Sequence, residues 1–121
     1  MRALVACSVV VAGLLSAVPA MAQAQKQYTW TGYGEGQGNC NRYKMTIDVT
    51  VVGTSVKGTF MQEGRTQRFW DAVNMDAAGN FRATAKVQDG SMKVIGKITP
   101  SGGNVVLDGY CKFNAKTLTS K

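Results

Sequence analysis

Strict alternation of apolar and polar side chains constrains this chain more than any other feature. It is clearest where Tyr43, Met45, Ile47, Val49 and Val51 alternate with Lys44, Thr46, Asp48 and Thr50. Successive side chains of a β-strand point to opposite faces, so this pattern predicts a strand with one face in a core and the other in solvent. No stretch after residue 24 keeps a helical period for three turns, so we expect an all-β domain.

Turn residues divide the rest of the chain into short strands. Asp89-Gly90 is the strongest hairpin signal, because both residues tolerate the positive φ of a two-residue turn. The expected strands cover residues 27–33, 43–51, 55–62, 66–75, 81–88, 91–99 and 104–113, with an eighth over 115–119 if that segment pairs. Short loops make neighbours in sequence neighbours in space, which predicts an antiparallel meander.

A flat meander would leave two open edges, which chains avoid by closing into a barrel or by folding into two packed sheets. Gly58, Gly96 and Gly109 each fall on the inward side of an expected strand. Inward glycines let a sheet bend sharply or let a bulky side chain from across the core approach, and both are common in small barrels. We therefore expect a small closed barrel, with a two-sheet sandwich as the alternative.

The first 24 residues have the pattern of a secretion signal. Met1-Arg2 is basic, residues 3–18 carry no charge, and Pro19 precedes small-x-small sites that end at Ala22 and Ala24. The uncharged run is shorter than the roughly 20 residues that a membrane-spanning helix needs. We expect cleavage after Ala22 or Ala24, export to the periplasm or the medium, and a single β-domain over residues 25–121.

Export would leave two cysteines, Cys40 and Cys111, because Cys7 lies in the leader. An even pair in an oxidising compartment predicts one disulfide. A structural zinc site needs four Cys or His ligands, so we expect no metal. A bridge that closes a loop of about 70 residues restricts the unfolded chain by roughly 4 kcal/mol in the entropic model.

The sequence offers little for catalysis, because it has no histidine and would keep no free thiol after export. We therefore expect no enzyme and no cofactor. Asp71 is the one carboxylate that shares the side of expected inward residues, namely Phe69, Val73 and Met75. Such a carboxylate is a catalytic candidate, although it more often marks a bulge or a pairing with arginine.

The expected hairpin registers gather cations and aromatic rings on one outer face. A turn at Asp89-Gly90 pairs Lys86 with Lys93 and Arg82 with Lys97. Loops over residues 76–80 and 100–103 then place Trp70 opposite Lys86 and Tyr110 opposite Lys93. The predicted binding residues are Trp70, Lys86, Lys93 and Tyr110 in one row, flanked by Arg82 and Lys97.

This row and the basic charge predict the class of partner. The whole chain has a net charge of +7, and loss of Arg2 with the leader lowers it by one. We expect an exported binding module for an anionic lipid, lipopolysaccharide or acidic polysaccharide, or for a protein partner, while export argues against nucleic acid. The structural alternative is that each lysine simply packs over its aromatic neighbour.

Two other functions stay open. Tyr28-Thr29-Trp30-Thr31-Gly32 resembles the first strand of the lipocalin and avidin barrels. That likeness is one of fold only and implies a calycin-like barrel that binds a small apolar ligand in its interior. A rigid domain with one disulfide also suits an inhibitor of a secreted or periplasmic enzyme.

Overall fold

The computed structural model describes residues 24–121, so the expected leader lies almost wholly outside the described residues. Nine strands and one short 3-10 helix make up the described part. They are β1 (Gln25–Tyr33), η3 (Cys40–Arg42), β2 (Lys44–Val52), β3 (Ser55–Gln62), β4 (Arg68–Asn74), β5 (Asn80–Val87), β6 (Gly90–Thr99), β7 (Gly102–Asp108), β8 (Lys112–Ala115) and β9 (Thr119–Ser120). None of residues 24–121 belongs to a helix that is long and apolar enough to cross a bilayer.

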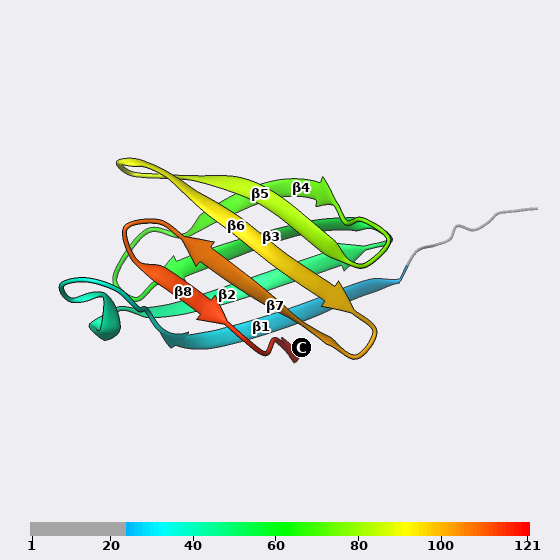
Figure 1. The fold of residues 1–121 in the computed structure, drawn as a ribbon, viewed down its shortest axis with the longest axis horizontal. Coiled ribbons are helices and arrows are strands. Elements are labelled where there is room, and N and C mark those ends of the chain that lie inside the picture. The colour runs from blue at the N-terminus through cyan, green and yellow to red at the C-terminus, as the bar shows by residue number, and fades with distance from the viewer. Residues whose placement is uncertain (1–23) are drawn as a thin grey trace, which may run out of the picture.

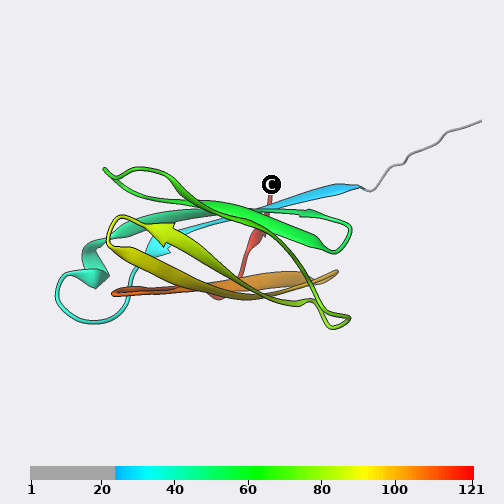
Figure 2. The same ribbon diagram turned by 90° about the horizontal axis from the view of Figure 1, so that it is seen from above.

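The strands form two antiparallel sheets that face each other as two layers (Figures 1 and 2). The first sheet has the order β4-β3-β2-β1-β9, and the second has the order β5-β6-β7-β8. Each sheet is a meander of consecutive strands, and the chain passes from one layer to the other between β4 and β5. The short strand β9 then returns to the edge of β1.

The prediction of an all-β chain with antiparallel strands and one disulfide is confirmed. Closure into one barrel is not found among residues 24–121, where the strands divide between two sheets. The strand with the clearest alternation behaves as expected, because Met45, Ile47, Val49 and Val51 are buried while the residues between them are partly exposed. Alternation therefore identified the core face of β2 correctly.

Trp70 lies at the centre of the core and joins the two sheets. Its indole stacks on Phe60 of the first sheet and on Phe81 of the second, with ring centroids 6.4 Å apart in both pairs. Aromatic pairs at this separation each contribute about 0.5–1.5 kcal/mol beyond the area they bury. The indole Nε1 is buried and finds no hydrogen-bond partner in the described part of the chain, so the ring is held by packing alone.

Two inward glycines make room for these rings. Gly58 pairs directly with Trp70, and Gly96 pairs directly with Phe81. A Cβ at either glycine would overlap the ring of its partner. The expected role is confirmed for Gly58 and Gly96, although the bulky side chain comes from the neighbouring strand rather than from across the core. The inward placement of Gly109 is wrong, because this residue is exposed in the turn between β7 and β8.

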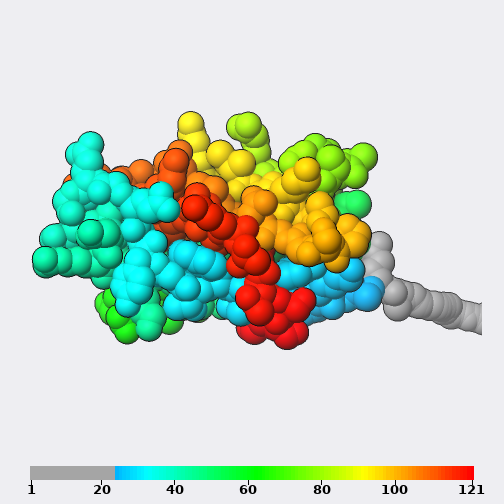
Figure 3. Space-filling view, turned by 60° about the horizontal axis from the view of Figure 1, so that its bottom comes forward, coloured from blue at the N-terminus to red at the C-terminus, as the bar shows by residue number. Residues whose placement is uncertain are grey.

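The C-terminal segment covers one side of the sandwich (Figure 3). Leu118 is buried, and β9 adds to the exposed edge of β1 through Tyr28 and Thr29. At the end of the molecule near η3, the Cys40–Cys111 disulfide joins the loop between β1 and β2 to the turn between β7 and β8. Beside the disulfide, Glu35 of the same loop forms a β-bridge with Lys112 of β8, so the covalent bond and two backbone hydrogen bonds together tie the first sheet to the second.

We expect a Gly58→Ala substitution to destabilise the fold by about 1–3 kcal/mol, because the added methyl group collides with the Trp70 ring in a packed core. Chemical denaturation monitored by tryptophan fluorescence measures this loss. The adjacent Lys57→Ala variant is the control, since Lys57 is exposed. Equal stability of the two variants would contradict the close approach of Trp70 to the backbone of β3.

Asp76 organises the loop that carries the chain between the layers. Its carboxylate accepts hydrogen bonds from the backbone N–H groups of Ala78 and Asn80, both at 2.9 Å. The hydrogen bond from the Asn80 backbone is the main cause of a pKa that lies below the ordinary value of an aspartate. Ionised Asp76 is therefore favoured by the folded loop.

This lowered pKa predicts the direction of a pH effect. The contribution of Asp76 to stability is complete above the unfolded-state pKa and is lost as pH falls through the folded-state pKa. An Asp76→Asn variant keeps an acceptor oxygen without a titrating group, so its stability should depend less on pH in the acid range. Urea unfolding of both proteins at neutral and strongly acidic pH measures the difference, and identical pH dependence would refute it.

Candidate functional site

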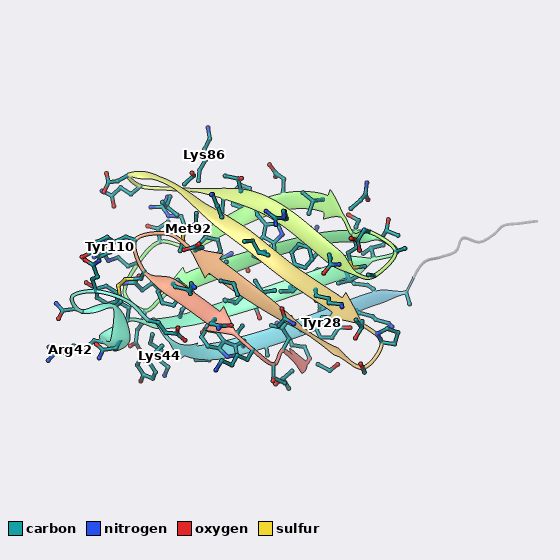
Figure 4. All side chains as sticks on the ribbon, viewed as in Figure 1. Tyr28, Arg42, Lys44, Lys86, Met92 and Tyr110 are labelled. Atoms are coloured by element: carbon teal, nitrogen blue, oxygen red, sulfur yellow. A yellow bond between two sulfur atoms is a disulfide. The ribbon has the colours of Figure 1, made fainter. Side chains whose placement is uncertain are left out.

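Four of the predicted site residues share one surface of the molecule. Arg82, Lys86, Lys93 and Lys97 are all exposed on the outer face of the second sheet. Lys112 of β8 adds a fifth cation to that face. We call these five residues the basic face. Lys86 extends outward from β5 (Figure 4).

The predicted pairing within this face is wrong. Lys86 lies opposite Ser91, Lys93 lies opposite Thr84, and Lys97 lies opposite Asn80. The turn between β5 and β6 consists of Gln88 and Asp89 rather than Asp89 and Gly90, which shifts the register by two residues. A shift of two keeps every side chain on its face and changes only its partners.

The aromatic part of the predicted row does not exist on this face. Trp70 is 2% exposed and belongs to the first sheet, because residues 75–79 cross between layers and do not form a hairpin. Tyr110 is 80% exposed, but it lies in the turn between β7 and β8, and Lys93 faces Asp108 instead. The prediction that Trp70 and Tyr110 face Lys86 and Lys93 is therefore wrong.

A β-bulge explains why the inward side of β4 was assigned incorrectly. Val73 pairs with Val56 while Trp70 pairs with Gly58, so β4 contains one more residue than β3 across this interval. The extra residue lets Trp70 and Val73 both point inward and leaves Asp71 exposed.

Among the described residues, no three His, Cys, Asp or Glu side chains cluster in a way that would hold a metal ion.

A hollow of about 670 Å³ opens between the sheets at the end of the molecule that carries the disulfide. Four segments meet there: the start of β2, the turn between β3 and β4, the turn between β5 and β6, and the turn between β7 and β8. We call this hollow the end groove. Its lining residues are Tyr43, Met45, Phe60, Gln62, Gly64, Arg65, Thr66, Arg68, Val87, Gln88, Asp89, Ser91, Met92, Tyr110, Cys111 and Phe113.

The floor of the end groove is apolar and its rim is polar. Met45 and Phe60 of the first sheet and Met92 and Phe113 of the second are buried side chains that form the floor. Tyr110, one of the predicted site residues, stands exposed at the rim (Figure 4). An apolar hollow with a few polar groups at its mouth is the usual form of a small-molecule site.

The charged side chains of the rim divide by sheet. Arg65 and Arg68 belong to the turn between β3 and β4 and to the start of β4, on the first sheet. Asp89 lies across the groove in the turn between β5 and β6, on the second sheet. Neither arginine has a carboxylate within 4.0 Å in the described part of the chain, where the ion pair found joins Lys121 and Asp48 at 3.4 Å.

Sequence reasoning placed Tyr110 among the binding residues but missed the two arginines and the apolar floor. One signal was present, because Arg68 stands two residues before Trp70 and therefore shares its side of the strand. Once Trp70 is known to be buried, Arg68 must point toward the space between the sheets. The other lining residues come from three separate turns and from strands of both sheets, and their meeting depends on the packing of the two sheets.

A second hollow of about 330 Å³ lies at the opposite end of the sandwich. Tyr28, Val51, Met75 and Ile98 supply apolar walls, and Lys26 is the charged residue that lines it. It has about half the volume of the end groove.

Comparison of the chain with family models, curated proteins and solved structures finds no match. A fold alone does not assign a function, so the chemistry and geometry of the site must indicate it.

Proposed function

We propose that this chain is a non-enzymatic binding module of an exported protein, and that its binding site is the end groove. The main observation in favour of this proposal is the hollow of about 670 Å³, whose apolar floor is formed by side chains of both sheets. Its volume falls within the range of about 300–1,000 Å³ that is typical of small-molecule sites. A small apolar or amphipathic molecule is the class of ligand that suits it.

Export to the periplasm or the medium is part of the same proposal. The pattern of residues 1–24 supports a cleaved secretion signal. The Cys40–Cys111 disulfide supports an oxidising compartment, because such bonds persist there and are rare in the cytosol.

The residue chemistry supports binding rather than catalysis. The chain has no histidine, and both cysteines of the described part are joined in the disulfide. Asp71, the one carboxylate considered for catalysis, lies on the exposed side of a bulge and does not line the end groove. The groove therefore lacks the histidine base and the free thiol on which much covalent catalysis relies.

The first test fills the groove. A Val87→Trp substitution places an indole at a half-buried position of the groove wall, so the neutral fluorescent probe N-phenyl-1-naphthylamine should bind at least about ten-fold more weakly. Fluorescence titration measures the affinity. The matched control is Thr84→Trp, which adds the same ring to the exposed outer face of the same strand and should bind the probe like the original protein.

Two results would contradict the proposal. One is that the probe does not bind the unmodified protein at all. The other is that both tryptophan variants bind it equally well while their melting temperatures match that of the original protein.

The basic face supports a second candidate function, namely attachment to an anionic surface of the cell envelope. Its five cations share the outer side of one sheet with a single carboxylate, Asp108, which lies opposite Lys93 and Lys112. Ile95 and Val106 lie side by side near its centre. Cations around a small apolar centre suit anionic lipid, lipopolysaccharide or acidic polysaccharide.

A double substitution tests this second candidate. Lys86→Gln together with Lys93→Gln should weaken binding to vesicles of equal phosphatidylglycerol and phosphatidylcholine by about 2 kcal/mol, since each lysine near an anionic surface contributes about 1 kcal/mol. Vesicle co-sedimentation at low and physiological salt measures the loss, which should shrink as salt screens the charges.

The control removes the same charge elsewhere. Lys57→Gln together with Lys116→Gln leaves the basic face intact, since both residues are exposed outside it. If the two double variants bind vesicles alike, the attraction comes from diffuse positive charge and not from the basic face.

A further inference from the structure

We infer that the ligand of the end groove is a single-chain amphiphile whose anionic head is held by Arg65 and Arg68. This inference rests on the proposed function of the groove and names the chemistry of what enters it. The geometry places an apolar floor and two cations on the same hollow, and each part accounts for one half of such a molecule.

Arg68 is the central residue of this argument. It is the first residue of β4 and pairs directly with Phe60, so their side chains stand next to each other on the inward face of the first sheet. Arg68 is half-buried and lines the end groove beside that ring. The sheet therefore carries a cation on its inward face, where a side chain normally meets the core.

No protein group neutralises this cation at close range. Neither Arg68 nor Arg65 has a carboxylate within 4.0 Å in the part of the chain that is described. Asp89, the one carboxylate on the rim, belongs to the opposite sheet. The arginine side of the groove thus presents two positive charges to whatever occupies the space.

Guanidinium groups favour an oxygen anion over a neutral polar group. Their planar N–H donors match the geometry of carboxylate, sulfate and phosphate, and such charge-assisted hydrogen bonds are stronger than neutral ones. A ligand with a cationic head would instead be repelled by Arg65 and Arg68. The head of the amphiphile is therefore anionic.

The floor suits an alkyl tail. Met45 and Met92 come from opposite sheets, and flexible methionine side chains adapt to chains of different length and shape. Phe60 and Phe113 complete the apolar floor and are buried in the core. Each further methylene that enters this space should raise the affinity about four-fold.

The experiment compares three molecules that share a ten-carbon alkyl chain and differ in the head: decyl sulfate, 1-decanol and decyltrimethylammonium. The two ionic molecules are used below their micelle concentrations, and 1-decanol is used below its solubility limit, to displace N-phenyl-1-naphthylamine from the full chain. Decyl sulfate should compete at concentrations at least about ten-fold lower than 1-decanol, and the cationic molecule should compete worst.

Substitution of the two arginines tests the assignment of the head site. Arg65→Gln together with Arg68→Gln should bring decyl sulfate within about two-fold of 1-decanol, because only the charged head loses its partners. The affinity for 1-decanol should change much less, because its hydroxyl group makes neutral hydrogen bonds that glutamine can replace. Arg65→Gln alone, at an exposed position, should give part of this effect and covers the case in which the double variant does not fold.

The matched control is Arg82→Gln together with Lys97→Gln, which removes two charges from the basic face and should keep the preference for decyl sulfate. If the control loses the preference as fully as the arginine variant, diffuse charge explains it and the inference is wrong. If decyl sulfate and 1-decanol compete equally with the original protein, the anionic head is wrong while the groove remains a binding site. If no molecule displaces the probe, or the probe itself does not bind, the proposed function fails as well.

Discussion

The stacking of Trp70 between Phe60 and Phe81 is the interaction on which the rest of the molecule depends. Through this stacking, one ring contacts aromatic rings of both sheets. It requires Gly58 and Gly96, because a side chain at Gly58 would collide with Trp70 and a side chain at Gly96 would collide with Phe81. The bulge in β4 turns Trp70 inward at this point. Two meanders with little hydrogen bonding between them are thus held at a fixed separation by aromatic rings at their centre.

That arrangement also explains why the hollows lie at the ends. The rings fill the middle of the space between the sheets, whereas the sheets are joined at the ends by loops, by the Cys40–Cys111 bond and by the β-bridge between Glu35 and Lys112. At the disulfide end, the side chains that follow the rings outward are the two flexible methionines, Met45 and Met92, and then the polar turns. The end groove is therefore continuous with the core, and Phe60 belongs to both.

The sequence predicted which face of a strand each side chain occupies far better than it predicted which residue lies opposite on the neighbouring strand. The outward positions of Lys86 and Lys93 followed from period-2 alternation and survived a register error of two residues, because such a shift moves a side chain along its face without turning it over. The prediction for Trp70 failed for a different reason, because a bulge breaks the alternation itself. Asp71 on the expected inward side was the one local sign of a bulge, and it did not show which residues would turn inward. The sequence also did not show that residues 75–79 cross from one sheet to the other, because the same types of turn residue occur in hairpin loops within one sheet.

The basic face and the end groove differ in how specific a structure each of them needs. The basic face could be read from the sequence because it needs only alternation and charge, and for the same reason any exported basic β-protein would present something like it. The end groove depends on Arg68 at an inward position beside Phe60 and on two methionines from opposite sheets. It also depends on three turns that meet at one end of the molecule. A protein does not need this combination in order to be soluble. The half-buried guanidinium of Arg68 also loses hydration that an exposed one keeps. An anion bound at the mouth of the apolar hollow would compensate for this loss. The end groove is therefore the better supported of the two proposed sites, and the attachment of the basic face to an anionic surface remains the second proposal.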